Sequence, residues 1–116
     1  MKYLLTLHMD PVVWDTLADD DKNAVYAGHG TFIETITASG EMVETKALAE
    51  PGDCVTVRVR NQDVQRETGL VGGAPAFLCG YYVVDVQSQE RAVELAALIP
   101  DARHSAVEVR RVLHEA

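Results

Sequence analysis

One histidine of the sequence, His29, occupies a position where an imidazole can do chemistry inside a fold. It comes four residues after Val25 and three before Phe32, so the three side chains share one face of a helix. Gly28 and Gly30 flank it, and each glycine costs a helix interior roughly 1 kcal/mol relative to alanine. Two such costs beside one histidine predict a close approach by a ligand or by another backbone segment.

A neutral imidazole in a partly apolar pocket can act as a general acid or base near neutral pH. This chemistry requires a carboxylate that orients the ring, and we expect Asp10, at the end of the first strand, to supply it. His29 and Asp10 are therefore the candidate catalytic residues. The alternative is a core or interface histidine whose ring is satisfied by a backbone carbonyl.

His8 and Asp10 lie two residues apart, which puts both side chains on the same side of an extended strand. This spacing allows an imidazole–carboxylate pair or part of a metal site, and it makes His8 a candidate ligand-binding residue. Two ligands do not make a metal site, and no third ligand is evident at helical or loop spacing. We expect no metal and no cofactor.

Arginine and tyrosine side chains on strands supply two further candidates. Arg58 and Arg60 share the polar face of one strand, and a guanidinium binds a carboxylate in bidentate fashion. Arg58 is therefore a candidate clamp for a small carboxylate, with a solvated, ion-paired face as the alternative. Tyr81 and Tyr82 must point to opposite faces of their strand, and we take Tyr82 as the candidate donor to a ligand, with core packing as the alternative.

These side chains depend on a series of strands and helices that periodicity and turn signals predict. The predicted strands are 2–8, 41–48, 54–60, 77–86 and 106–113, and the predicted helices are 10–17, 21–39 and 88–99. Residues 62–68 suit a small hairpin arm and 69–75 a loop. The order predicts an α+β fold, a ferredoxin-like βαββαβ with an antiparallel sheet built from the first four strands. The strand 106–113 is then the last or an additional strand.

A ferredoxin-like sheet carries helices on one face only, so its other face must be covered. The chain has no segment left to cover that face. We therefore expect a homodimer in which two sheets pack face to face.

The composition of the chain bounds the remaining function classes. Its 116 residues, 47% hydrophobic and 24% charged, predict a single globular domain over 1–116. A net charge of −8 repels phosphate backbones and anionic membrane surfaces, so we expect no nucleic-acid partner and no membrane partner. The first residues lack the features of a secretory signal, and Cys54 and Cys79 are isolated in sequence. We expect free thiols, no nucleophilic cysteine and a cytoplasmic location.

Several segments resemble one known family. They are the opening KYLLTLHMD, ASGEMVETKAL (38–48), TVRVR (56–60), CGYYVVDV (79–86) and IPDARHSAVEVRRV (99–112). In this order and spacing they are similar to the YCII-related proteins, and most similar to their DGPF subgroup. The resemblance implies a dimeric α/β barrel made of two ferredoxin-like halves.

The resemblance also bears on single residues. In YCII proteins a histidine taken as the catalytic group lies eleven residues before the glycine that ends the first long helix. His29 and Gly40 reproduce that separation. The tetrapeptide that names the DGPF subgroup is replaced here by Thr68-Gly69-Leu70-Val71, in which only the glycine survives.

Two main functions follow from these observations. The first is an enzyme resembling the lyases and isomerases of similar dimeric barrels, with a histidine general acid or base moving a proton on a small organic molecule. The alternative is a non-catalytic dimer that binds a small ligand or regulates a partner. A dimer without any ligand would instead pack the apolar neighbours of His29 tightly and leave no cavity.

Overall fold

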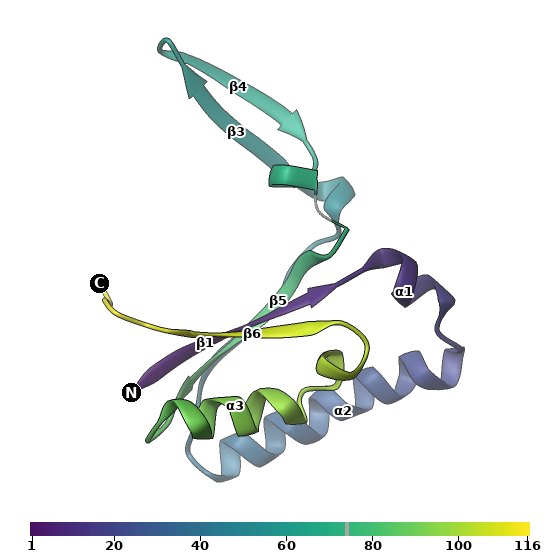
Figure 1. The fold of residues 1–116 in the computed structure, drawn as a ribbon, viewed down its shortest axis with the longest axis vertical. Helices are drawn as coiled ribbons and strands as arrows, with labels where there is room; N and C mark the ends of the chain where they lie inside the picture. The colour runs from purple at the N-terminus through teal and green to yellow at the C-terminus, as the bar shows by residue number, and fades with distance from the viewer. Residues whose placement is uncertain (74) are drawn as a thin grey trace.

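The structure of the chain is a computed structural model that describes residues 1–73 and 75–116. Its elements are β1 (Lys2–Met9), α1 (Pro11–Thr16), α2 (Asp19–Ala38), β2 (Met42–Ala47), β3 (Val55–Arg60), β4 (Asp63–Thr68), β5 (Phe77–Asp85), α3 (Gln89–Leu98) and β6 (Ala106–Arg111), with short 3-10 turns at Pro51–Asp53, Val71–Gly73 and Pro100–Arg103. Four strands form an antiparallel sheet in the order β2-β5-β1-β6. Figure 1 shows α2 and α3 on one side of this sheet. The predicted α+β, ferredoxin-like fold is confirmed.

The core lies between the sheet and the two long helices. Along β1, the alternate side chains of Tyr3, Leu5, Leu7 and Met9 are buried, as a strand with one covered face requires. The helices meet them with Phe32 and Ile36 from α2 and with Ala92, Leu95 and Ala96 from α3. Complete burial of a leucine-sized side chain contributes about 1.5–3 kcal/mol, so this contact holds α2 and α3 in place.

Local signals define the helix ends. The Asp10 carboxylate accepts the Val12 N–H at 2.9 Å and caps α1, and the Ser88 hydroxyl accepts the Arg91 N–H at 3.1 Å and caps α3. Gly40, with φ of 80°, follows the end of α2 in the left-handed conformation that glycine adopts readily. All three predicted helices are confirmed, with ends that differ by at most two residues.

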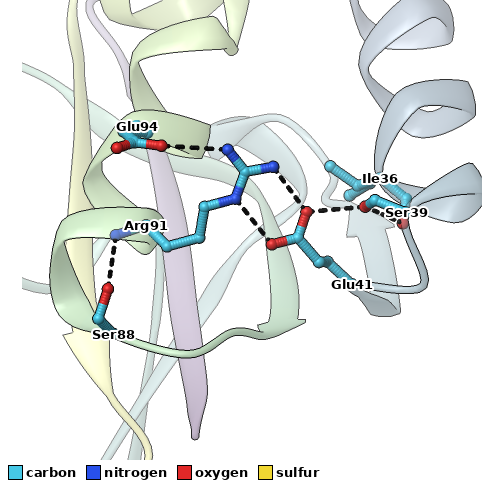
Figure 2. Close-up of polar contacts among 6 residues, drawn as sticks. All are labelled: Ile36, Ser39, Glu41, Ser88, Arg91 and Glu94. Carbon is cyan, nitrogen blue, oxygen red and sulfur yellow. Dashed lines mark hydrogen bonds and ion pairs between the residues drawn. The ribbon is translucent and has the colours of Figure 1, made fainter.

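An ion pair joins Glu41, in the link that follows α2, to Arg91 near the start of α3 (Figure 2). The Arg91 guanidinium donates to both oxygens of Glu41, at 2.9 and 2.8 Å, and to Glu94 at 3.1 Å. The Ser39 hydroxyl donates to the same Glu41 carboxylate at 2.7 Å. These hydrogen bonds, above all those from Arg91, hold the pKa of Glu41 below its usual range. The bidentate contact fixes the relative position of the two helices.

The segment 54–60 was predicted to lie in the main sheet, and this prediction is wrong. Among the described strands, β3 pairs only with β4, in a separate two-stranded sheet that projects from the rest of the molecule (Figure 1). Asn61 and Gln62, with φ of 51° and 71°, turn the chain back within two residues, and this geometry favours a local hairpin. The places beside β1 and β5 are taken by β6 and β2. The predicted hairpin arm at 62–68 and the predicted last strand are confirmed, as β4 and β6.

Within the predicted loop 69–75, Val71–Gly73 forms a 3-10 turn, and Ala74 lies outside the described residues. Among the helices of the described residues, none is both long and apolar enough to cross a bilayer.

Candidate functional site

His29 lies in the middle of α2 and connects two buried groups. Its Nε2 atom is 2.6 Å from Asp101 Oδ1, and its Nδ1 atom is 2.7 Å from the Tyr82 hydroxyl. The side chain of His29 is 24% exposed, whereas that of Asp101 is 5% exposed. Both ring nitrogens therefore have a partner while one part of the ring stays accessible. These three residues, which we call the relay, come from α2, β5 and the 3-10 turn that follows α3.

Close packing of that turn on α2 positions Asp101. Pro100 starts the turn directly after the buried Ile99, and its ring lies against Gly28. A Cβ atom at Gly28 would overlap the Cγ of Pro100, so only glycine allows this approach. The glycine beside His29 therefore admits the ring of Pro100, whereas the sequence predicted a ligand or another backbone segment at this place. At Gly30 a Cβ would meet nothing within 4 Å.

A bulge in β5 brings Tyr82 and Cys79 to the same face of the sheet. Leu7 pairs with Gly80 and His8 with Leu78, so Cys79 is an extra residue on β5. The Cys79 Sγ atom lies 3.4 Å from the Leu7 carbonyl oxygen and 3.8 Å from Asp101 Oδ2, and its single proton can be donated to either acceptor. The thiol therefore approaches the carboxylate oxygen that does not contact His29.

Burial controls the acidity of both neighbours of Asp101. Burial raises the pKa of Tyr82 to about 12, and the negative charge of Asp101 adds to this effect. Burial likewise raises the pKa of Cys79 to about 11, again with a contribution from Asp101. Both groups keep their protons at neutral pH. With neutral His29, the arrangement that satisfies every atom has Nε2–H donating to Asp101 and the Tyr82 hydroxyl donating to Nδ1.

The relay borders a pocket of about 790 Å³ between the sheet, α1, α2 and the link from β2 to β3. His29, Tyr82 and Asp101 all line it. The walls are largely apolar, with Met9, Trp14, Ile33, Leu48 and Phe77 among them. A pocket of this size with a few converging polar groups is typical of small-molecule sites.

Comparison with known families identifies the family of the chain. A family model, the YCII-related domain, matches residues 1–115. The chain belongs to the YCII-related family. No curated protein matches the chain.

In this YCII-related protein, the carboxylate beside His29 differs from the one predicted. We expected Asp10 to orient the ring, but Asp101 and Tyr82 occupy both ring nitrogens. The Asp10 carboxylate instead accepts the Val12 N–H and caps α1. The prediction for Asp10 is corrected for this reason: its side chain is committed to the start of the helix.

The three residues predicted to bind a ligand lie at different places in the structure. Tyr82 lines the pocket and contacts His29. His8 contacts the Thr6 hydroxyl at 3.0 Å, and it lies beside the buried Leu7 and Met9 on the alternating β1, so its side chain is on the other face of the sheet. Arg58 lies on the β3–β4 hairpin, where its guanidinium contacts Glu67 at 3.2 Å. The structure therefore brings only Tyr82 to His29.

Sequence reasoning missed Asp101 and Cys79 as parts of the site. Asp101 belongs to the PDAR segment, which carried the family resemblance but had received no chemical role. A useful signal was Pro100, which follows Ile99 just after α3, because proline ends a helix and suits the first position of a new turn. Among residues 1–73 and 75–116, no group of three or more histidine, cysteine or acidic side chains could hold a metal ion.

Alkaline pH should destabilise the protein through Tyr82 and Cys79. Their pKa values in the folded state, about 12 and about 11, lie above their ordinary values of 10.0 and 9.0. The folded state therefore keeps protons that the unfolded chain has already lost, and this stabilisation is present below pH 9 and is lost as pH rises toward 12. Urea unfolding at pH 8, 9.5 and 11 should show stability falling more steeply in the wild type than in a Tyr82→Phe/Cys79→Ala variant. Equal slopes in the two proteins would contradict the burial of these groups.

Proposed function

We propose that this protein is an enzyme that moves a proton on a small, largely apolar organic molecule, as lyases and isomerases do. The supporting observation is that His29 joins a buried carboxylate to a tyrosine hydroxyl at the edge of a pocket. A carboxylate on one side of an imidazole fixes its tautomer and stabilises the imidazolium form. An enzyme that takes a proton from a neutral substrate requires both effects.

Proton transfer would pass through Tyr82. In the resting state the Tyr82 hydroxyl donates to His29 Nδ1, so its oxygen is free to accept a proton. The substrate proton moves to the Tyr82 oxygen as the original hydroxyl proton moves to Nδ1. The substrate keeps the electron pair as an enolate or similar anion, and Asp101 holds the imidazolium. Return of the proton at another atom gives isomerisation, and loss of a leaving group from the anion gives elimination.

Ligand screening followed by isotope exchange tests this proposal. Small cyclic ketones, lactones, phenols and aromatic acids are screened by thermal shift, because a ligand of the folded state raises the melting temperature. Compounds that bind are then incubated with the protein in D2O, and loss of their C–H signals is followed by NMR. We expect exchange with wild type and with His114→Ala, an exposed histidine near the C-terminus, and none with His29→Ala. Exchange at the wild-type rate in His29→Ala would refute the role of His29.

A second candidate function is a binding protein without catalysis. It is favoured by the aromatic contact between Trp14 and Tyr26, whose ring centroids are 5.7 Å apart and which both line the pocket. Tyr82→Phe separates the two functions, because it keeps the ring and removes the hydroxyl. A binding protein should retain its ligand affinity with no isotope exchange in either form, whereas an enzyme should lose exchange on this substitution.

We also propose that the protein belongs to the DGPF subgroup, forms a dimeric α/β barrel and works in the cytoplasm. The surviving glycine of the subgroup tetrapeptide, Gly69, has φ of 113°, a conformation that other residues rarely adopt, which supports its retention. Helices cover one face of the main sheet, and its other face carries the exposed Leu78, which supports a second copy packed there. The free thiols of Cys54 and Cys79 suit a reducing compartment.

A further inference from the structure

We propose that the β3–β4 hairpin is an arm that contacts the second copy of the chain and stabilises the homodimer. The arm, residues 55–68, would pack its valine face on the partner. This inference rests on the proposed dimer and is independent of the chemistry of the pocket.

The arm has one apolar face that no other part of residues 1–73 and 75–116 covers. Val55, Val57 and Val59 alternate along β3 and so point the same way, and Val64 lies directly opposite Val59 on β4. The four valines are between 53% and 67% exposed. Alternation of valine with polar residues is typical of a strand with one buried face and one solvated face. The pattern therefore indicates that the valine face is covered by another surface.

The arm also lacks the support that a hairpin needs. A two-stranded hairpin alone is marginally stable in water and requires a third strand or a packed face. Within the part of the chain that the structure describes, β3 and β4 pair only with each other. Their turn places Gln62 at φ of 71°, which is strained for glutamine. The Gly69 N–H donates to the Cys54 carbonyl at 2.9 Å, and this hydrogen bond links the two ends of the arm to each other. The arm therefore needs stabilisation from outside.

The position of the arm favours a second copy of the chain as the molecule that covers its valine face. Figure 1 shows the hairpin connected to the start of β5 and projecting on the side of the sheet away from α2 and α3. Six residues in each strand give the arm a reach of about 20 Å, whereas packed sheets lie only about 10 Å apart. A copy packed on the open face of the sheet would therefore lie within reach of the arm.

The charge of the arm also favours a second copy of the chain as its partner. The arm carries three arginines, Arg58, Arg60 and Arg66, against two acidic residues, Asp63 and Glu67, whereas the whole chain has a net charge of −8. The remainder of the chain is therefore strongly acidic. A slightly basic arm is electrostatically complementary to the acidic surface of another copy.

Sedimentation velocity over a range of protein concentrations tests this proposal. The test variant is Val55→Thr/Val57→Thr/Val59→Thr, because threonine keeps the β-branched shape that strands favour and removes the apolar surface. We expect the dissociation constant of the dimer to rise at least 30-fold. The control is Gln65→Thr, a solvent-exposed change on the opposite face of the arm, which should leave the constant unchanged.

A second variant separates failure of the arm from failure of the dimer. Leu4 lies between the buried Tyr3 and Leu5, so its side chain is on the open face of the sheet, and Leu4→Glu should dissociate a dimer that packs through that face. If Leu4→Glu dissociates the dimer and the triple variant does not, the arm proposal is refuted and the dimer stands. A wild type that is monomeric at 100 µM, with arm amides that exchange equally fast at all concentrations, refutes both. Arm amides protected independently of concentration would show the arm folded on its own chain and would also refute the proposal.

Discussion

Asp101→Asn should keep the fold and lower the rate of substrate proton exchange by roughly 1,000- to 10,000-fold. The carboxylate of Asp101 accepts the Nε2–H of His29, whereas the amide of asparagine can donate to Nε2. The imidazole then carries its proton on Nδ1. In that tautomer His29 can no longer accept the proton of Tyr82, so the relay is broken without any change of shape.

Spectroscopy and a matched control make this prediction specific. The ¹⁵N chemical shifts of the His29 ring should show the proton on Nε2 in the wild type and on Nδ1 in the variant. Asp10→Asn is the control, because asparagine caps a helix as well as aspartate does and Asp10 does not contact His29. Asp10→Asn should leave exchange unchanged. Equal loss in both variants, or full activity in Asp101→Asn, would contradict the assignment of Asp101.

Removing the charge of Asp101 should also change Cys79, which provides a readout that does not depend on a substrate. The Asp101 charge helps to raise the pKa of the Cys79 thiol to about 11, so the neutral asparagine should lower that pKa. The rate of thiol alkylation as a function of pH measures the change. An unchanged profile would mean that the two side chains do not interact.

The second large effect concerns the two glycines beside His29. Gly28→Ala should destabilise the protein by about 1–3 kcal/mol, because the added methyl group overlaps the ring of Pro100. Gly30→Ala should stabilise it by about 0.5–1 kcal/mol, because the methyl group meets nothing and alanine favours the helix. Urea unfolding of the two variants at pH 7 measures the difference directly.

The pair also tests how the site is positioned. Pro100 precedes Asp101, so a displaced turn should move the carboxylate away from His29 and reduce activity in Gly28→Ala. Gly30→Ala changes no neighbour of the relay and should keep wild-type activity. Similar stability and activity in the two variants would show that contact between α2 and the turn does not position Asp101.

Much of the fold follows from periodicity in the sequence. The apolar stripe of α2, the capped helix α3 and the strands β1 and β5 all match their predicted positions. The error at β3 has a physical origin. Alternating valines indicate a strand with one covered face, but they carry no information on which sheet it joins or which chain covers it. The sheet that β3 joins depends on which strands pair with β5 and β1, and in the structure these partners are β2 and β6.

The candidate site was predictable only in part. His29 follows from its place on the stripe of α2, because helical spacing is a local property. Asp101 lies 72 residues away, and its contact depends on Pro100 packing against Gly28. The sequence alone does not tell whether Asp10 or Asp101 contacts His29. A carboxylate at the end of a strand, such as that of Asp10, can equally well cap the helix that follows.

The wide separation of the relay residues has a consequence for the order of folding. His29 meets Tyr82 across 53 residues and Asp101 across 72, so no short segment of the chain contains His29 together with either partner. Contacts between such distant residues form late, because the entropy of closing the long loops must first be overcome. During synthesis, α2 leaves the ribosome long before its carboxylate partner. We therefore expect a nascent chain to have no activity until the turn after α3 has left the ribosome and packed against α2.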